Sequence, residues 1–218
     1  MSIDLHNDLL ALRRDLLALS ALVEQQVSRT IEAMTKSDAE LAREVKGSDT
    51  EVDAMDLRIE EQCMRLLALG SPMAGDLRQI LSTLRISGQL ERIADLAKGI
   101  SKRTIKLSKL DAIRLPSSLL EMAEATRKMI ADALVALSNE DVELCRQVRH
   151  ADNLVDNLNK EVLHWSRNEI PRNVENTNAA IHLLTIAQRL ERICDITTLI
   201  VEEVIFQVEG RIVRHGVE

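Results

Sequence analysis

The chain has 218 residues, enough for one large or two small domains, and its 28 basic and 35 acidic side chains give a net charge of −7. One Trp, one Phe, no Tyr, seven Gly and three Pro are too few for the strand cores and turns of a many-stranded sheet. The acidic balance lacks the basic footprint of a duplex-binding protein, so we do not expect nucleic acid as a partner.

The first half of the sequence predicts three helices. Leucines spaced alternately by three and four residues indicate a first helix over residues 5–34. Ser37-Asp38 is a capping signal for a second helix, which we expect to run unbroken to residue 69. Gly70-Ser71-Pro72 ends that helix and starts a third over residues 73–107.

The second half predicts three more helices after a connection at residues 108–116. Pro116-Ser117 starts a helix that ends near residue 139, and Glu140 or Asp141 opens the next. We expect that fifth helix to stop before Pro171, because proline disfavours helix at the preceding residue. A sixth helix is predicted from about residue 173 to 209, ended by Gly210.

The two halves repeat one another. Leu-Glu-Arg-Ile-Ala-Asp at 90–95 recurs as Leu-Glu-Arg-Ile-Cys-Asp at 190–195, with five of six positions identical. A weaker pattern, V-(K/R)-x-x-D-x-x-V-D, relates residues 45–53 to 148–156. Long helices joined by short loops form bundles. We therefore predict an all-α fold of two tandem three-helix bundles, residues 1–109 and 110–218, related by a pseudo-two-fold axis.

The repeats bring acidic residues to equivalent places. Side chains four apart lie on one face of a helix, so each half carries two acidic pairs, and antiparallel packing would bring four carboxylates to one groove. The candidate metal ligands are Asp49, Asp53, Glu91 and Asp95 in the first half, and Asp152, Asp156, Glu191 and Asp195 in the second. Asp56 lies close to the first line, and Asn159 stands in its place in the second. Oxygen ligands suit magnesium, manganese or calcium, and carboxylates also bind iron and zinc.

Two other interpretations of these carboxylates stay open. Acidic pairs are common by chance on solvated helix faces, and Arg92 and Arg192 could neutralise neighbouring carboxylates without a metal. A ferritin-like di-iron oxidase would need Glu-x-x-His on two helices, and only Glu161–His164 matches. No nucleophile–base pairing and no phosphate loop stand out.

The location of the protein is predicted from what the sequence lacks. No apolar run reaches the roughly 18 residues of a membrane-spanning helix. The N-terminal Met1–Asp4 is acidic where a secretion signal would be basic. Cys63, Cys145 and Cys194 show no zinc spacing. We expect a cytoplasmic protein with reduced thiols.

The doubled E-R-x-x-D within long helices resembles the PhoU family of phosphate-transport regulators. The resemblance covers essentially the whole chain, including Leu22–Val27, Pro72–Arg78 and the tail Glu209–His215. It implies two three-helix bundles and a negative regulator of the bacterial phosphate-starvation response rather than an enzyme.

The family resemblance also implies partners and cofactors. The partners would be the ATPase subunit of the phosphate ABC transporter and a membrane sensor histidine kinase, with the membrane reached only through them. The carboxylates named above would bind metal ions, with iron, zinc, manganese and magnesium all open. We expect a homodimer. A PhoU-like accessory protein of another ion transporter is the alternative with the same fold and ligands.

Overall fold

The chain folds into helices joined by short connections. The computed structural model describes residues 4–47, 49–111 and 113–213, and of Asp49 it describes only the backbone. All regular structure in these ranges is helical, as predicted. The first half holds α1 (Leu5–Thr35), α2 (Ala39–Gly47), α3 (Asp49–Leu69) and α4 (Ala74–Leu107). The second half holds α5 (Ser117–Asn139), α6 (Val142–Arg172), the short 3₁₀ helix η1 (Val174–Asn176) and α7 (Thr177–Glu209).

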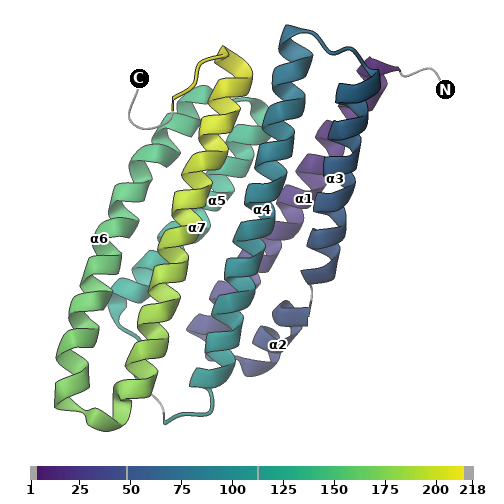
Figure 1. Cartoon of the computed structure of the whole chain (residues 1–218). Coiled ribbons are helices and arrows are strands. Elements are labelled where there is room, and N and C mark those ends of the chain that lie inside the picture. Colours follow the sequence, from purple (N-terminus) through teal and green to yellow (C-terminus); the bar gives the residue numbers. More distant parts are fainter. Residues whose placement is uncertain (1–3, 48, 112, 214–218) are drawn as a thin grey trace.

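The helices form two bundles that lie side by side (Figure 1). α1, α3 and α4 pack together with the short α2 against α1 and α4, and α5, α6 and α7 pack together in the second half. α4 and α7 lie next to each other along the middle of the molecule, and theirs is the most extensive contact between any two helices. α1 also contacts α5. The predicted pair of three-helix bundles is therefore confirmed, whereas the boundary at residues 109 and 110 stays a prediction.

One continuous apolar core runs through both bundles. It includes Leu12 and Leu19 of α1, and it includes Leu90 and Leu190, which begin the repeated motif and are almost completely buried. Burial of a leucine side chain contributes about 1.5–3 kcal/mol. The repeated motif thus anchors α4 and α7 through its leucine while its acidic residues occupy another face of each helix.

Local capping chemistry sets several helix ends where the sequence predicts them. Asp38 Oδ1 accepts hydrogen bonds from the backbone N–H groups of Glu40 and Leu41, both at 3.0 Å, at the start of α2. Asp141 Oδ1 accepts from Leu144 N at 3.0 Å at the start of α6. Gly210 ends α7 with φ of +70°, a left-handed conformation that glycine adopts without strain.

Two predicted helix boundaries are wrong. The single second helix is two helices, because α2 ends at Gly47, a residue of low helix propensity, and α3 begins at Asp49. The fifth helix does not stop before Pro171 but continues to Arg172. Proline in the last turn removes only one helical hydrogen bond, and Asn173 N still donates to Glu169 O at 3.0 Å. Among the described residues, no helix combines the length and apolar character needed to cross a membrane.

Candidate metal centre

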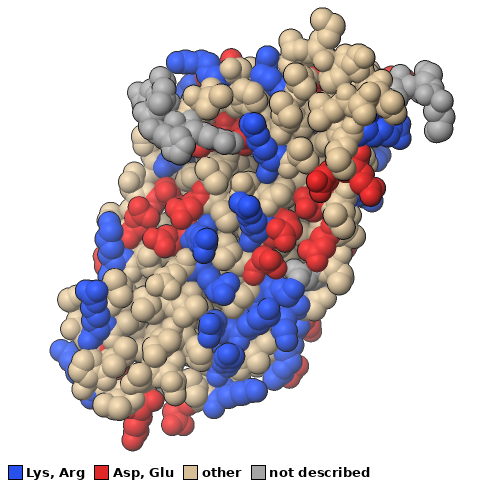
Figure 2. Space-filling model, viewed as in Figure 1, with Lys and Arg blue, Asp and Glu red and all other residues tan. Residues whose placement is uncertain are grey.

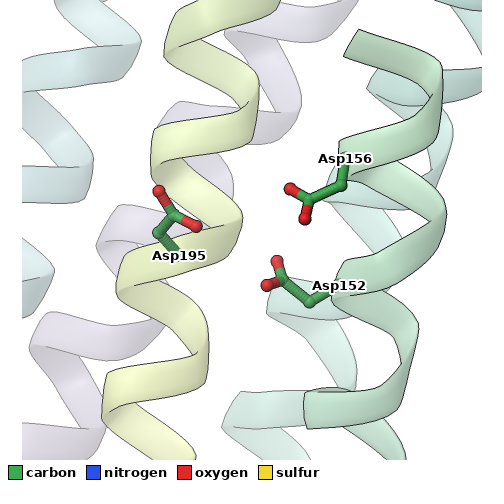
Figure 3. Close-up of side chains that lie close together, drawn as sticks. All are labelled: Asp152, Asp156 and Asp195. Atoms are coloured by element: carbon green, nitrogen blue, oxygen red, sulfur yellow. The ribbon is translucent and has the colours of Figure 1, made fainter. Parts of the chain in front are cut away.

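Three carboxylates of the second bundle converge between α6 and α7. Asp152 and Asp156 lie one turn apart on α6, and Asp195 points toward them from α7 (Figure 3). One ligand oxygen from each lies within 4.8 Å of the others. The buried Val155 and Ile193 fix the two helices against the core, so the three aspartates are held on facing helix surfaces. The sequence-predicted ligands Asp152, Asp156 and Asp195 are therefore brought together.

The electrostatics of this cluster favour a bound cation or proton. Asp152 is half-buried, and its burial, followed by the charges of Asp195, Asp156 and Glu191, raises its pKa to about 6. Burial and the neighbouring Asp156 also raise the pKa of Asp195, opposed by the positive charge of Arg192. No ion pair to the three aspartates exists within the described ranges. Like charges at such spacing repel by several kcal/mol at an effective dielectric of about 20 unless they are neutralised.

The donor set fits a hard metal ion. Oxygens that coordinate one cation at about 2.0–2.6 Å lie within roughly 5 Å of one another, which is the spacing of these three carboxylates. Glu191 is close enough to raise the pKa of Asp152 but is not one of the three grouped ligands. Asn159, one turn beyond Asp156, has a buried Oδ1 without a hydrogen-bond partner among the described residues.

The first bundle holds a second acidic cluster at the equivalent place. Burial raises the pKa of Glu91, and the charges of Asp95, Asp56 and Asp53 raise it further, so these four carboxylates share one region between α3 and α4. Within the described part of the first bundle, no three ligand atoms meet the spacing found in the second. Asp53 and Asp95 are exposed. The side chain of the predicted ligand Asp49 lies outside the described part of the chain.

Asp56 belongs to the first cluster although it was not among the predicted ligands. Its Oδ1 accepts a hydrogen bond from the buried Ser87 Oγ at 2.5 Å. The signal was present in the sequence as a third aspartate three residues after Asp53. In the second repeat, Asn159 stands in place of Asp56 and Ala187 in place of Ser87. The hydroxyl donor is therefore missing there, and the amide oxygen of Asn159 has no hydrogen-bond partner among the described residues.

The remaining chemistry-bearing residues lie apart from these clusters or are inert. The three cysteines are free and buried, and burial raises the pKa of each thiol to about 12. Cys194 Sγ donates to Thr126 Oγ1 at 3.4 Å within the core of the second bundle. His150 and His164 are exposed on α6. None of these groups is arranged as a nucleophile with its base.

Comparison with known proteins identifies the family. Residues 16–104 and 119–204 each match the PhoU domain. A "Phosphate-specific transport system accessory protein PhoU homolog" of Zymomonas mobilis is 34% identical over 204 residues, covering 94% of this chain and 86% of the relative. A homolog of the same description from Aquifex aeolicus is 30% identical and covers 93% of this chain and 92% of the relative.

Solved structures agree over most of the chain. The crystal structure of PhoU from Pseudomonas aeruginosa superposes with a TM-score of 0.91 at 31% identity, covering 94% of this chain and 99% of that one. The phosphate transport system regulatory protein PhoU from Streptococcus pneumoniae gives a TM-score of 0.87 at 25% identity, covering 96% and 99%. These are accessory and regulatory proteins, so the prediction that the chain is not an enzyme is confirmed through its relatives. The chain belongs to the PhoU family of phosphate-specific transport system accessory proteins.

Proposed function

We propose that this chain is a cytoplasmic, metal-binding adaptor that negatively regulates the phosphate-starvation response. It connects the ATPase subunit of a phosphate ABC transporter to a membrane sensor histidine kinase and limits phosphate uptake when phosphate is plentiful. The observation that carries the proposal is the match of both halves to PhoU, together with full-length relatives described as accessory proteins of phosphate-specific transport.

The acidic cluster supplies the metal-binding part of the proposal. Asp152, Asp156 and Asp195 would hold one ion between α6 and α7, and Asp53, Glu91 and Asp95 would hold another between α3 and α4, with Asp49 and Glu191 as further ligands. Iron, zinc, manganese and magnesium are the ions to test. A bound cation would neutralise the repelling carboxylates and fix the separation of the two helices that carry them.

A reporter assay in the native bacterium tests the regulatory part. We expect deletion of the gene to raise alkaline phosphatase activity in phosphate-rich medium, and the intact gene to restore low activity. The double variant Asp152→Asn/Asp195→Asn is then compared with Glu161→Gln, a control on the exposed face of the same α6. Low activity in the deletion strain would contradict negative regulation and favour an accessory role for another ion transporter.

The predicted homodimer is part of the same proposal. Leu57 and Met64 lie seven residues apart on the outer face of α3 and are 60% and 53% exposed. Apolar residues two turns apart on an exposed face can pack against the same face of a second copy. Light scattering of the wild type and of Leu57→Glu tests this: the wild type should have the mass of a dimer and the variant that of a monomer.

A further inference from the structure

A long groove follows the contact between α4 and α7 and lies between the acidic clusters on its two sides. It has a volume of about 700 Å³ and is lined by equivalent positions of the two repeats. Gln89 and Arg189 are such a pair, as are Arg92 and Arg192, and Gly99 and Leu199. Figure 2 shows Lys and Arg side chains gathered over this contact, with acidic patches on both flanks.

The groove gathers positive charge on a protein of net charge −7. Arg92 and Lys102 of α4 and Arg189 and Arg192 of α7 line it. None of these four forms an ion pair within the described residues. The only carboxylates in the lining are Asp95 and Asp195, which also belong to the acidic clusters. The lining therefore carries an excess of two positive charges, and more when those aspartates are engaged by a cation.

Inside this groove the two repeats differ at two pairs of positions, and the difference makes room for the guanidinium of Arg189. Arg189 stands where the first half has Gln89, and its guanidinium lies against Gly99, which stands where the second half has Leu199. A Cβ atom on Gly99 would lie only 2.0 Å from Arg189 Nη1, so the glycine makes the room that the guanidinium occupies. Arg189 Nε and Gln89 Oε1 are both buried and unpartnered among the described residues.

The dimensions of the groove favour an elongated occupant over a small anion. Residues 89–102 of α4 border it, and at about 1.5 Å per residue this is about 20 Å of helix. Leu96, Ile196 and Leu199 add apolar surface to the same lining. An apolar strip accompanied by cations is complementary to an amphipathic helix with acidic residues beside its apolar face.

We infer that the α4/α7 groove is the docking surface for an acidic, amphipathic segment of a partner protein. The inference rests on the proposed adaptor function and gives the chemistry of the partner's side of that contact. Arg189, Arg92, Arg192 and Lys102 bind its carboxylates, and Leu96 and Leu199 pack against its apolar residues. Docking here spans both repeats, so the partner contacts α4 and α7 at the same time.

Binding measurements with charge-reversed variants test the inference. The transporter ATPase subunit and the cytoplasmic part of the sensor kinase from the same bacterium are titrated against the full-length wild type, Lys102→Glu and Lys102→Glu/Arg189→Glu. The matched control is Arg167→Glu/Arg172→Glu, two exposed arginines on α6. We expect the groove variants to lose tenfold or more of their affinity for one partner, with a weaker dependence on salt, and the control to bind as the wild type does. Lys102 is exposed, so its single variant reports on binding even if the double variant is unstable.

Each of the other outcomes overturns either this inference alone or the adaptor function with it. If the wild type binds neither partner, the adaptor function and this inference both fail. If the wild type binds and the groove variants bind equally well, the docking surface lies elsewhere and only this inference fails. Loss of binding to anionic phospholipid vesicles or to polyphosphate, without loss of partner binding, would assign the groove to those polyanions. A change in oligomeric mass would make it an interface between copies of this chain.

Discussion

The two bundles share a pattern of acidic residues and use it differently. In the second bundle, α6 runs without interruption past His150 and presents Asp152 and Asp156 directly opposite Asp195. In the first bundle, the equivalent stretch is divided between α2 and α3 at Gly47, which occupies the place of His150. Among the described side chains, Asp152, Asp156 and Asp195 converge in the second bundle, and Glu91 lies with Asp95, Asp56 and Asp53 in the first.

The cluster of the first bundle has a supporting hydrogen bond that the second lacks among the described residues. Asp56 is held by Ser87, so part of the negative charge in the first bundle is stabilised by a hydrogen bond within the protein. The second bundle lacks both residues, and there burial and the neighbouring carboxylates raise the pKa of Asp152 to about 6. From this hydrogen bond we predict that the second site depends more strongly on an external cation and that the two sites differ in affinity.

Removal of ligands should have the largest effect, and it should be unequal between the halves. Asp156→Asn/Asp195→Asn removes two of three converging carboxylates, and we expect the metal affinity of the second site to fall by about 100-fold or more. The equivalent Asp53→Asn/Asp95→Asn should lower total metal content less. Calorimetric titration with each ion, and elemental analysis of the purified proteins, measure both. Equal losses from the two pairs would contradict the ranking of the sites.

The charge repulsion in the second cluster should be visible in the pH dependence of stability without metal. The pKa of Asp152 is about 6 in the folded protein and about 3.9 when unfolded, so the folded state holds this proton more tightly. The free energy of unfolding therefore falls as pH rises from about 4 to about 6. After allowance for solvent screening at a half-exposed group, we expect Asp152→Asn to be more stable than the wild type at pH 7 by about 1–2 kcal/mol.

Urea denaturation in EDTA measures this difference. It should vanish near pH 4, where Asp152 is protonated in the folded wild type, and it should reverse when a tightly bound divalent ion is added. Glu91→Gln is the counterpart in the first bundle, where the pKa is raised in the same direction. A variant that is less stable than the wild type at pH 7 in EDTA would show that Asp152 is stabilised by contacts that outweigh the repulsion.

The repeated sequence predicted the clusters but could not rank them. Spacings of four place Asp152 with Asp156 and Glu191 with Asp195 on single helix faces, and that much follows from helix geometry. Which members meet across the helix pair depends on the axial offset and rotation of α6 against α7, which are set by core packing. That is why Asp195 joins the group while Glu191 lies just outside it.

The fold followed from the sequence more completely than the site did. Helix ends with a local chemical cause, such as the caps at Asp38 and Asp141 and the left-handed Gly210, were predictable. The division of the second helix at Gly47 and the continuation of α6 to Arg172 were not, because in both cases a weak local signal competes with packing. The groove between α4 and α7 was also not predictable, because it is formed by the packing of the two bundles against each other.

The hydrogen bond that distinguishes the first bundle should contribute a moderate stability. Ser87→Ala removes the donor to Asp56 and is expected to lower the free energy of unfolding by about 1 kcal/mol, since a half-buried acceptor loses its partner. In the second bundle, Ala187→Ser places a hydroxyl at the equivalent position and should have a smaller effect, of opposite sign, by offering a donor to Asn159. Thermal and urea denaturation of both variants measures the pair. Equal destabilisation by both would mean that the repeat does not place positions 87 and 187 in equivalent surroundings.

Of these variants, Gly99→Ala should change stability least while clearly changing the groove. Gly99 is buried in the interior of α4, where alanine is favoured over glycine by up to about 1 kcal/mol. The methyl group of Gly99→Ala would collide with the guanidinium of Arg189, a flexible group that can swing away, so the gain in helix propensity should offset most of the strain. We expect a free energy of unfolding within about 1 kcal/mol of the wild type, together with weaker partner binding. A stable Gly99→Ala variant with unchanged partner affinity would mean that the position of Arg189 has no part in docking, even if the charge of the groove does.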